Sequence, residues 1–324
     1  MRAQSPGQWS AAMAMTMAMA AVSAASVAAE APSFRINETR GPVRPADMTP
    51  FKGESSLEIL AGPTNGLDSA FMVHQRLAPG VHKTGLYTLP VEHTYLVLEG
   101  RLGVQIGTDE FVAEPDTLVL VPAGMPHQAW NAGSTLERDL QAIAPAPSRD
   151  LASMMKPAQP RKIENAAQYV RVPPALGKLA GGEGHESLNE RILAERSNGT
   201  RFLLERLNDV LPGGGRTEPH GHPFDQIYFV KKGTMTIEYG AFKYTASPNS
   251  LIVLPNGTVH SNQNMGTEPQ SIITLMLPQP AEGQGAGIPF NISRAGAGRG
   301  AGQAGGGGQA AGGARNRATG GTTP

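Results

Sequence analysis

The sequence predicts an all-β protein that contains two equal units in tandem. The prediction rests on an internal repeat, on short strand-like segments and on the turn residues between them. The same residues recur 133 positions apart, namely Pro79-Gly80 and Pro212-Gly213, Tyr95 and Tyr228, Gly100 and Gly233, and then Pro122, Gly124, His127 and Asn131 with Pro255, Gly257, His260 and Asn264. A constant spacing of this length indicates a duplicated structural unit.

Each unit contains short segments rich in Val, Ile, Leu, Thr and Tyr, separated by Gly or Asn turns, which is typical of strands. We expect strands at residues 94–98, 101–106 and 117–121, and at residues 226–230, 234–239 and 250–254. The chain has 40 Gly and 27 Pro, more than a helical protein tolerates and typical of a turn-rich fold. Residues 144–179 are rich in Pro and predict a linker, with a short helix near residues 150–155.

The two ends of the chain differ from the middle. Residues 1–29 contain Arg2, then an uncharged stretch rich in Ala and Met, then the small residues Val27 and Ala29, which is the order of a secretory signal peptide. An uncleaved membrane anchor is the alternative, but an anchor needs about 20 strongly apolar residues. We expect an exported protein, periplasmic or secreted, with no stable membrane span after cleavage. Residues 281–324 are mostly Gly and Ala and predict a disordered tail.

The expected organisation is a signal peptide (1–29), an N-terminal unit (30–145), a Pro-rich linker (146–185), a C-terminal unit (186–280) and a disordered tail (281–324). The formal net charge is zero, which argues against a nucleic-acid partner, because nucleic-acid binding relies on clustered Lys and Arg. The chain has no Cys. Disulfides, thiolate metal ligands and cysteine nucleophiles are therefore excluded.

The C-terminal unit carries two short motifs. They are His220-x-His222 followed by Gln226 and Gly233, and Pro255-x-Gly257-x-x-His260-x-x-x-Asn264. This pair resembles the two characteristic motifs of the cupin superfamily, and the N-terminal unit repeats the second motif in full. The resemblance spans roughly residues 65–280 and implies a bicupin, with two tandem cupin β-barrels of the jelly-roll type and a site inside the barrel.

Three imidazoles in these motifs predict a metal site in the C-terminal barrel. A period of two places His220, His222 and Gln226 on one face of a continuous strand and Asp225 on the other. His260 follows the Pro-x-Gly turn and reaches the same place from a later strand. We expect one divalent first-row transition metal, and Fe, Mn, Ni, Cu, Co and Zn all accept imidazole ligands. The family usually has Glu where this chain has Gln226, so this position brings no negative charge.

The N-terminal barrel retains fewer ligands. Tyr87 and Leu89 stand where the other copy has His220 and His222, so that only His93 and His127 remain as weaker candidate ligands. Since stable sites usually need three protein ligands, we expect this barrel to serve packing, dimerisation as a homodimer, or the shape of a substrate channel. Weak metal binding, with His82 or Glu92 recruited, is the alternative.

Two functional classes remain open. The first is a metal-dependent oxidoreductase, similar to the dioxygenases among bicupins, that acts on a small anionic or phenolic substrate; a decarboxylase or an isomerase is also compatible. The second is a non-catalytic module that binds a metal or a small ligand, and fold alone does not separate the two. No catalytic residue other than the metal ligands is predicted. Tyr228 shares the face of Gln226 and either lines the pocket or belongs to the core.

Overall fold

The structure is a computed structural model of the 324-residue chain, and it describes residues 33–81, 83, 85–146, 148–175, 188–215, 218–282 and 288–289. The predicted signal peptide and nearly all of the predicted tail lie outside these residues. Among the described residues, no helix has the length and apolar character that a membrane span requires.

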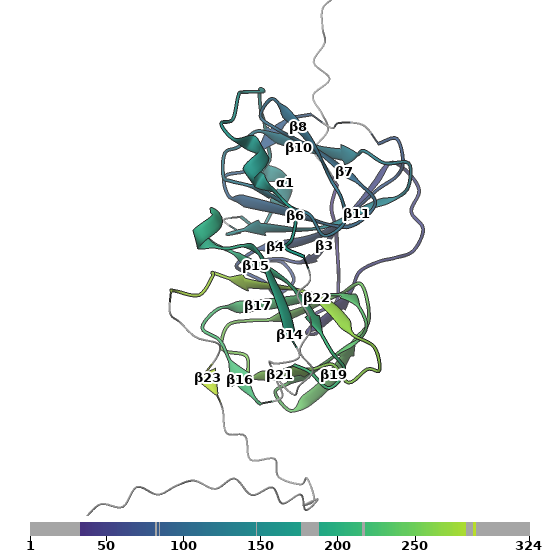
Figure 1. The fold of residues 1–324 in the computed structure, drawn as a ribbon, viewed down its shortest axis with the longest axis vertical. Coiled ribbons are helices and arrows are strands. Elements are labelled where there is room, and N and C mark those ends of the chain that lie inside the picture. The colour runs from purple at the N-terminus through teal and green to yellow at the C-terminus, as the bar shows by residue number, and fades with distance from the viewer. Residues whose placement is uncertain are drawn as a thin grey trace, which may run out of the picture. The chain divides into compact units, whose positions relative to one another are not determined.

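The two repeats contain matching strands (Figure 1). In the first repeat they are β3 (Ser55–Ala61), β4 (Phe71–Leu77), β5 (Tyr87–Thr88), β6 (Glu92–Glu99), β7 (Leu102–Ile106), β8 (Asp109–Ala113), β9 (Leu118–Val121), β10 (His127–Asn131) and β11 (Glu137–Ala144). In the second repeat they are β14 (Leu188–Ala194), β15 (Leu204–Val210), β16 (His220–Gly221), β17 (Asp225–Lys232), β18 (Met235–Tyr239), β19 (Phe242–Ala246), β20 (Ser250–Leu254), β21 (His260–Gln263) and β22 (Gln270–Leu277). Apart from the pair β9 and β20, counterparts begin 133 positions apart, so the predicted repeat is confirmed and extends beyond the motifs.

Each repeat forms a barrel from one large and one small sheet. In the first barrel the strand orders are β1-β3-β4-β11-β6-β9-β13 and β12-β5-β10-β7-β8. In the second barrel they are β14-β15-β22-β17-β20-β2 and β19-β18-β21-β16-β23. The described chain is thus nearly all β, as predicted. The helix expected near residues 150–155 is α1 (Leu151–Met154), and the Asp150 side chain caps it by accepting a hydrogen bond from the Ala152 amide.

Two short strands exchange places between the barrels. β2 (Val43–Pro45) precedes the first barrel but pairs with β20 of the second, where Val43 lies opposite Ile252. β13 (Val170–Arg171) precedes the second barrel but pairs with β9 of the first, where Val170 lies opposite Val119. Val119 and Ile252 are equivalent positions of the repeat. The exchange is therefore reciprocal and uses the same register.

Each of the two exchanged strands is held by an equivalent hydrogen bond from an arginine. Arg44 of β2 donates from Nη1 to the Leu60 carbonyl at 3.2 Å, and Arg171 of β13 donates from Nη1 to the Leu193 carbonyl at 3.1 Å. Leu60 and Leu193 are again equivalent positions. Each guanidinium thus links the exchanged strand to a strand of the other barrel, which is β3 for Arg44 and β14 for Arg171.

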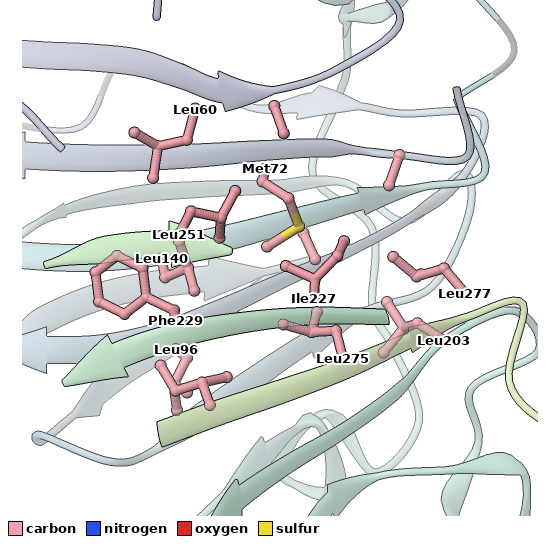
Figure 2. Packing of buried hydrophobic residues seen from close by; sticks show 14 of the residues in the cluster. Leu60, Met72, Leu96, Leu140, Leu203, Ile227, Phe229, Leu251, Leu275 and Leu277 are labelled. Carbon is pink, nitrogen blue, oxygen red and sulfur yellow. The ribbon is translucent and has the colours of Figure 1, made fainter. Parts of the chain in front are cut away.

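The large sheets of the two barrels pack face to face. Their facing side chains form one apolar cluster, in which Figure 2 shows Leu96 and Leu140 of the first repeat with Ile227, Phe229 and Leu275 of the second. Because side chains alternate between the faces of a strand, the neighbouring positions of β6, β11, β17 and β22 point into the barrels instead. The same sheets thereby form the contact between barrels and the wall of each interior.

The motif glycines that follow β6 and β17 are needed for close approach. Gly100 and Gly233 have φ of +76° and +74°, in the left-handed region that favours glycine. A Cβ on Gly100 would lie 2.4 Å from the Leu136 carbonyl oxygen, and a Cβ on Gly233 would lie 2.9 Å from the Cα of Gln270. Both turns therefore require glycine for space as well as for conformation.

Several short segments lie elsewhere than the predicted boundaries placed them. β2 lies within the predicted N-terminal unit but joins the other barrel. Within the predicted linker, β12 (Lys156–Pro157), the 3₁₀ helix at Ala166–Tyr169 and β13 contact the first barrel. β23 (Ile288–Pro289), within the predicted tail, pairs with β16 of the second barrel. β1 (Arg35–Ile36), in contrast, pairs with β3 inside the predicted N-terminal unit. Strands of two or three residues carry too few side chains to show a period in the sequence.

Candidate metal centre in the C-terminal barrel

The three predicted histidines converge inside the second barrel. His220 of β16 and His260 of β21 are direct partners across the small sheet. His222 follows β16 immediately, and its carbonyl oxygen accepts a hydrogen bond from the Gly257 amide at 2.9 Å. This bond joins the Pro-x-Gly turn of the second motif to the first motif. All three imidazoles are buried.

The segment from His220 to Gln226 is not the continuous strand that the sequence predicts. β16 ends at Gly221 and β17 begins at Asp225, and the chain passes from the small sheet to the large sheet between them. Pro223 lies in this break and has no amide hydrogen to donate to a ladder. His220 and Gln226 therefore approach the site from different sheets.

The imidazoles are close enough to share one ion. Ligand nitrogens of His220, His222 and His260 all lie within 4.8 Å of one another. Nδ1 of His220 lies 2.9 Å from the Glu218 carbonyl oxygen, and Nδ1 of His260 lies 3.0 Å from the Thr258 carbonyl oxygen. Because a carbonyl only accepts, both Nδ1 atoms carry the proton, and Nε2 is the atom of each ring that can bind a metal.

Gln226 offers an oxygen as the fourth candidate ligand, beside the three imidazole nitrogens. It lies in β17 between Leu254 of β20 and Met276 of β22. Its side chain is buried, and its Oε1 has no hydrogen-bond partner among the described residues. A buried amide oxygen without a partner is costly, and a cation beside it would remove that cost.

Asp225 points away from this site, as the alternation of the strand predicts. Its carboxylate accepts a hydrogen bond from the Asn256 amide at 2.8 Å and so holds the turn before His260. Asp225 is therefore a turn residue, and it leaves the ligand set without a carboxylate. The residues present fit a divalent transition metal with three imidazole ligands and one neutral oxygen.

The motif asparagines form the scaffold of the site. Asn264 donates to the carbonyls of Val210 and Glu268, both at 2.9 Å, and accepts from the Gly266 amide. Asn131 makes the same three bonds at the equivalent positions of the first barrel. Of the two predicted alternatives for Tyr228, the structure supports the core: Tyr228 packs in the interior apolar cluster, and its hydroxyl accepts a hydrogen bond from Asn262 at 3.0 Å.

The first barrel brings its two candidate ligands together differently. Nδ1 of His93 and Nε2 of His127 are hydrogen-bonded to each other at 3.1 Å, and Nδ1 of His127 bonds to the Met125 carbonyl. Burial lowers the pKa of His127 to about 4. Within the described part of this barrel there is no group of three potential ligands. Glu92 binds the amides of Arg201 and Phe202 instead, and His82 lies outside the described residues.

The first barrel also contains two acids that sequence reasoning missed. Glu137 and Asp139 alternate along β11 on its barrel side and are fully buried. Their four carboxyl oxygens are buried without a hydrogen-bond partner among the described residues, and the two groups lie close enough to affect each other's pKa. Gln141 lies next along the same face of β11, beside Asp139. Burial raises the pKa of both carboxyls. A proton shared between these neighbouring buried carboxyl groups would satisfy their oxygens.

Comparisons with known proteins agree with this architecture. The family model described as Cupin domain matches twice, at residues 73–137 and 207–276, and these ranges fall in the two barrels. The protein belongs to the cupin superfamily. With two matching barrels in one chain, it is a bicupin.

Individual relatives of this bicupin are distant. It is 33% identical over 99 residues to the tetracenomycin polyketide synthase protein TcmJ of Streptomyces glaucescens, a match that covers 30% of this chain and 66% of TcmJ. The structure of AerE from Microcystis aeruginosa matches with a TM-score of 0.52 and 14% identity, over 73% of this chain and 97% of AerE. A mutant of oxalate decarboxylase from Bacillus subtilis matches with a TM-score of 0.51 and 14% identity, over 71% of this chain and 75% of the decarboxylase.

Proposed function

We propose that this bicupin is a metal-dependent oxidoreductase of the dioxygenase type that acts on a small anionic or phenolic substrate in its C-terminal barrel. His220, His222 and His260 would hold one divalent first-row transition metal, with Gln226 as the fourth ligand. Export to the periplasm or the medium, and assembly as a homodimer, belong to the same proposal.

The observation that carries the proposal is the ligand set itself. Ligand nitrogens of three buried histidines, His220, His222 and His260, lie within 4.8 Å of one another. Gln226, four residues after His222, has a buried Oε1 without a hydrogen-bond partner among the described residues. Because Gln226 is neutral, a bound divalent ion would keep its full charge there. Such an ion supplies Lewis acidity and open positions for an anionic oxygen of the substrate.

The chain's own groups would set the geometry of that chemistry. The Nδ1–H bonds of His220 and His260 to backbone carbonyls fix both rings and their tautomers before any ligand arrives. Tyr228 and Asn262 add a hydrogen-bonded polar pair to the same interior. One matching structure is an oxalate decarboxylase, which makes a decarboxylation a further outcome to assay.

The alternative is a non-catalytic module that binds a metal or a small ligand. It is favoured by the position of Asp225, which is engaged at the turn before His260 and leaves no carboxylate beside the triad as a general base among the described residues. This class predicts metal binding without turnover.

One experiment separates the two classes. The purified full chain is stripped of metal and loaded separately with Fe, Mn, Ni, Cu, Co and Zn, and oxygen uptake and carbon dioxide release are measured against phenols, flavonols and dicarboxylates. Turnover that requires one metal and is lost in His260→Ala supports the oxidoreductase. Stoichiometric metal binding with no turnover on any substrate supports the binding module.

A further inference from the structure

The two barrels differ in the side chains around the second histidine position of the His-x-His motif. This position is His222 in the second barrel. In the first barrel that position is Leu89, and it belongs to a buried apolar cluster with side chains of β3, β4, β11 and α1. The members of this cluster include Ile59, Phe71, Val73, Val91, Ile143, Leu151 and Met154, with Leu57 packed against them. In the first barrel this position is therefore surrounded by a buried apolar cluster.

The second barrel has a charged pair at the same place. The repeat aligns Leu89 with His222, Val73 with Arg206 and Leu57 with Glu190. The strand register supports this alignment, because Val73 faces Gln141 across β4 and β11 while Arg206 faces Thr274 across β15 and β22. Arg206 thus stands where the first barrel has Val73. Val73 belongs to the same apolar cluster as Leu89, which is the equivalent of the candidate metal ligand His222.

Arg206 has hydrogen-bonding capacity to spare. Its Nη1 donates to Oε1 of Glu190, while its Nε is buried and has no partner among the described residues. The Arg206 side chain is 25% exposed and that of Glu190 is 35% exposed, so the pair lies at the boundary between interior and solvent. A guanidinium offers five donors in a rigid fork and binds a carboxylate through two of them.

We infer that Arg206 is a specificity-determining residue that binds the carboxylate of the substrate. The same substrate carries a separate enolic or phenolic oxygen, which faces the histidine triad. This inference rests on the proposed function and narrows its substrate class to small carboxylates. A substrate carboxylate beside Arg206 would accept a hydrogen bond from the buried Nε. The enolic or phenolic oxygen of the same molecule would then be directed toward the imidazoles. A phenol without a carboxylate would gain nothing from Arg206.

Salicylate and phenol form a matched pair of probes, since they differ only in the carboxylate. Isothermal titration calorimetry is performed with each probe on the full chain, both metal-free and loaded with Zn²⁺, which is redox-inactive. The variants are Arg206→Met, Arg206→Lys and Glu190→Gln, and Arg101→Met controls for the change of net charge, since Arg101 pairs with Glu114 on the exposed surface of the other barrel.

The expected result is tighter binding of salicylate than of phenol, with that preference reduced about 10- to 100-fold in Arg206→Met. Phenol affinity stays unchanged, and the preference is preserved in Glu190→Gln and Arg101→Met. Equal salicylate affinity in wild type and Arg206→Met, or an equal loss for both probes, overturns the inference. So does a loss of thermal stability shared by Arg206→Met and Glu190→Gln with no change in probe affinity, which is the behaviour of an ordinary edge-strand ion pair.

The design also separates this inference from the proposed function. Zn²⁺ uptake by the triad is measured first, by metal analysis. A chain that takes up no metal contradicts the proposed function, while the salicylate preference of the metal-free chain still measures Arg206. A chain that takes up metal but shows no Arg206-dependent preference contradicts only the inference.

Discussion

His93 and His127 donate and accept one hydrogen bond between their rings, with 3.1 Å between Nδ1 and Nε2. His127 is the equivalent of His260, and its Nε2 corresponds to the candidate metal-ligating atom of the second barrel. In the first barrel this atom is engaged by His93, beside the ring of Tyr87, whose centroid lies 4.3 Å from that of His127. One internal hydrogen bond thus occupies the place of a ligand-to-metal bond.

The first prediction concerns metal stoichiometry. We expect one equivalent of metal per chain, lost in His220→Ala and in His260→Ala and retained in His93→Ala, because among the described residues only the second barrel offers three imidazoles. Metal analysis after dialysis checks this, with circular dichroism as the folding control. Two equivalents in wild type, or one equivalent that survives His260→Ala, would show that the site is assigned to the wrong barrel.

The second prediction concerns Gln226. A carboxylate in Gln226→Glu adds a negative charge to a buried site, so that the metal-free protein loses about 1–3 kcal/mol of unfolding free energy. Metal affinity rises about tenfold or more, because the ion compensates that charge. Thermal unfolding with and without metal measures both effects. Gln226→Leu keeps the volume without the oxygen and serves as the control. Unchanged metal affinity in both variants would mean that Gln226 is not a ligand.

The site was largely predictable from the sequence because its residues are bound to motifs with fixed spacing. His220, His222 and His260 come together as the His-x-His spacing and the Pro-x-Gly turn predict. Within β17, Asp225 and Gln226 point to opposite faces, as the alternation of a strand requires. The sequence does not reveal the break at Pro223. The alternation of His220, His222 and Gln226 fits one continuous strand, although the chain changes sheet between His222 and Gln226. A change of sheet leaves no mark on that pattern.

Other features left no readable signal. The strand β11 begins Glu-Arg-Asp, a run of charges that is typical of solvated surface, yet Glu137 and Asp139 point into the first barrel. The exchanged strands β2 and β13 are too short to show periodicity. The Val-Arg pairs at Val43 and Val170 also lie 127 positions apart, outside the repeat spacing of 133. Only three-dimensional pairing reveals that they are equivalent.

The third prediction concerns these exchanged strands. Arg44→Met keeps the aliphatic stem and removes the donors to the carbonyls of Leu60 and Gly41, so we expect a loss of about 2–4 kcal/mol of unfolding free energy. Arg40→Met, at an exposed position four residues earlier, should change stability little. Urea unfolding followed by tryptophan fluorescence and by circular dichroism provides the measurement.

The same exchange predicts that the barrels unfold together. Each large sheet contains a strand from the other repeat, and Thr94 of the first barrel donates to Glu205 of the second at 3.0 Å in the contact between them. The two spectroscopic transitions should therefore coincide in wild type. Two separated transitions in wild type would show that the exchanged strands do not couple the barrels.

The fourth prediction concerns pH and the pair Glu137 and Asp139. Burial raises the pKa of both carboxyls, whereas unfolded carboxyls titrate near pH 4. The folded state therefore keeps a proton that the unfolded state releases. The stabilisation from the pair is complete below about pH 4 and is lost as pH rises toward the raised values. The slope is up to about 1.4 kcal/mol per pH unit for each proton.

Variants isolate the contribution of the pair. Glu205 adds to the wild-type slope with the same sign, because burial raises its pKa to about 7, so the comparison is made between slopes rather than from wild type alone. Glu137→Gln donates to Asp139 without titrating and should flatten the fall of unfolding free energy between about pH 5 and pH 9, and Glu137→Gln with Asp139→Asn should flatten it further. Glu110→Gln, which removes an exposed acid paired with Lys83, should leave the slope unchanged.

An infrared band of protonated carboxyl at neutral pH, absent from Glu137→Gln, would identify the shared proton directly. If the pair were instead neutralised by a bound cation, that band would be missing from wild type and a chelator would lower its stability.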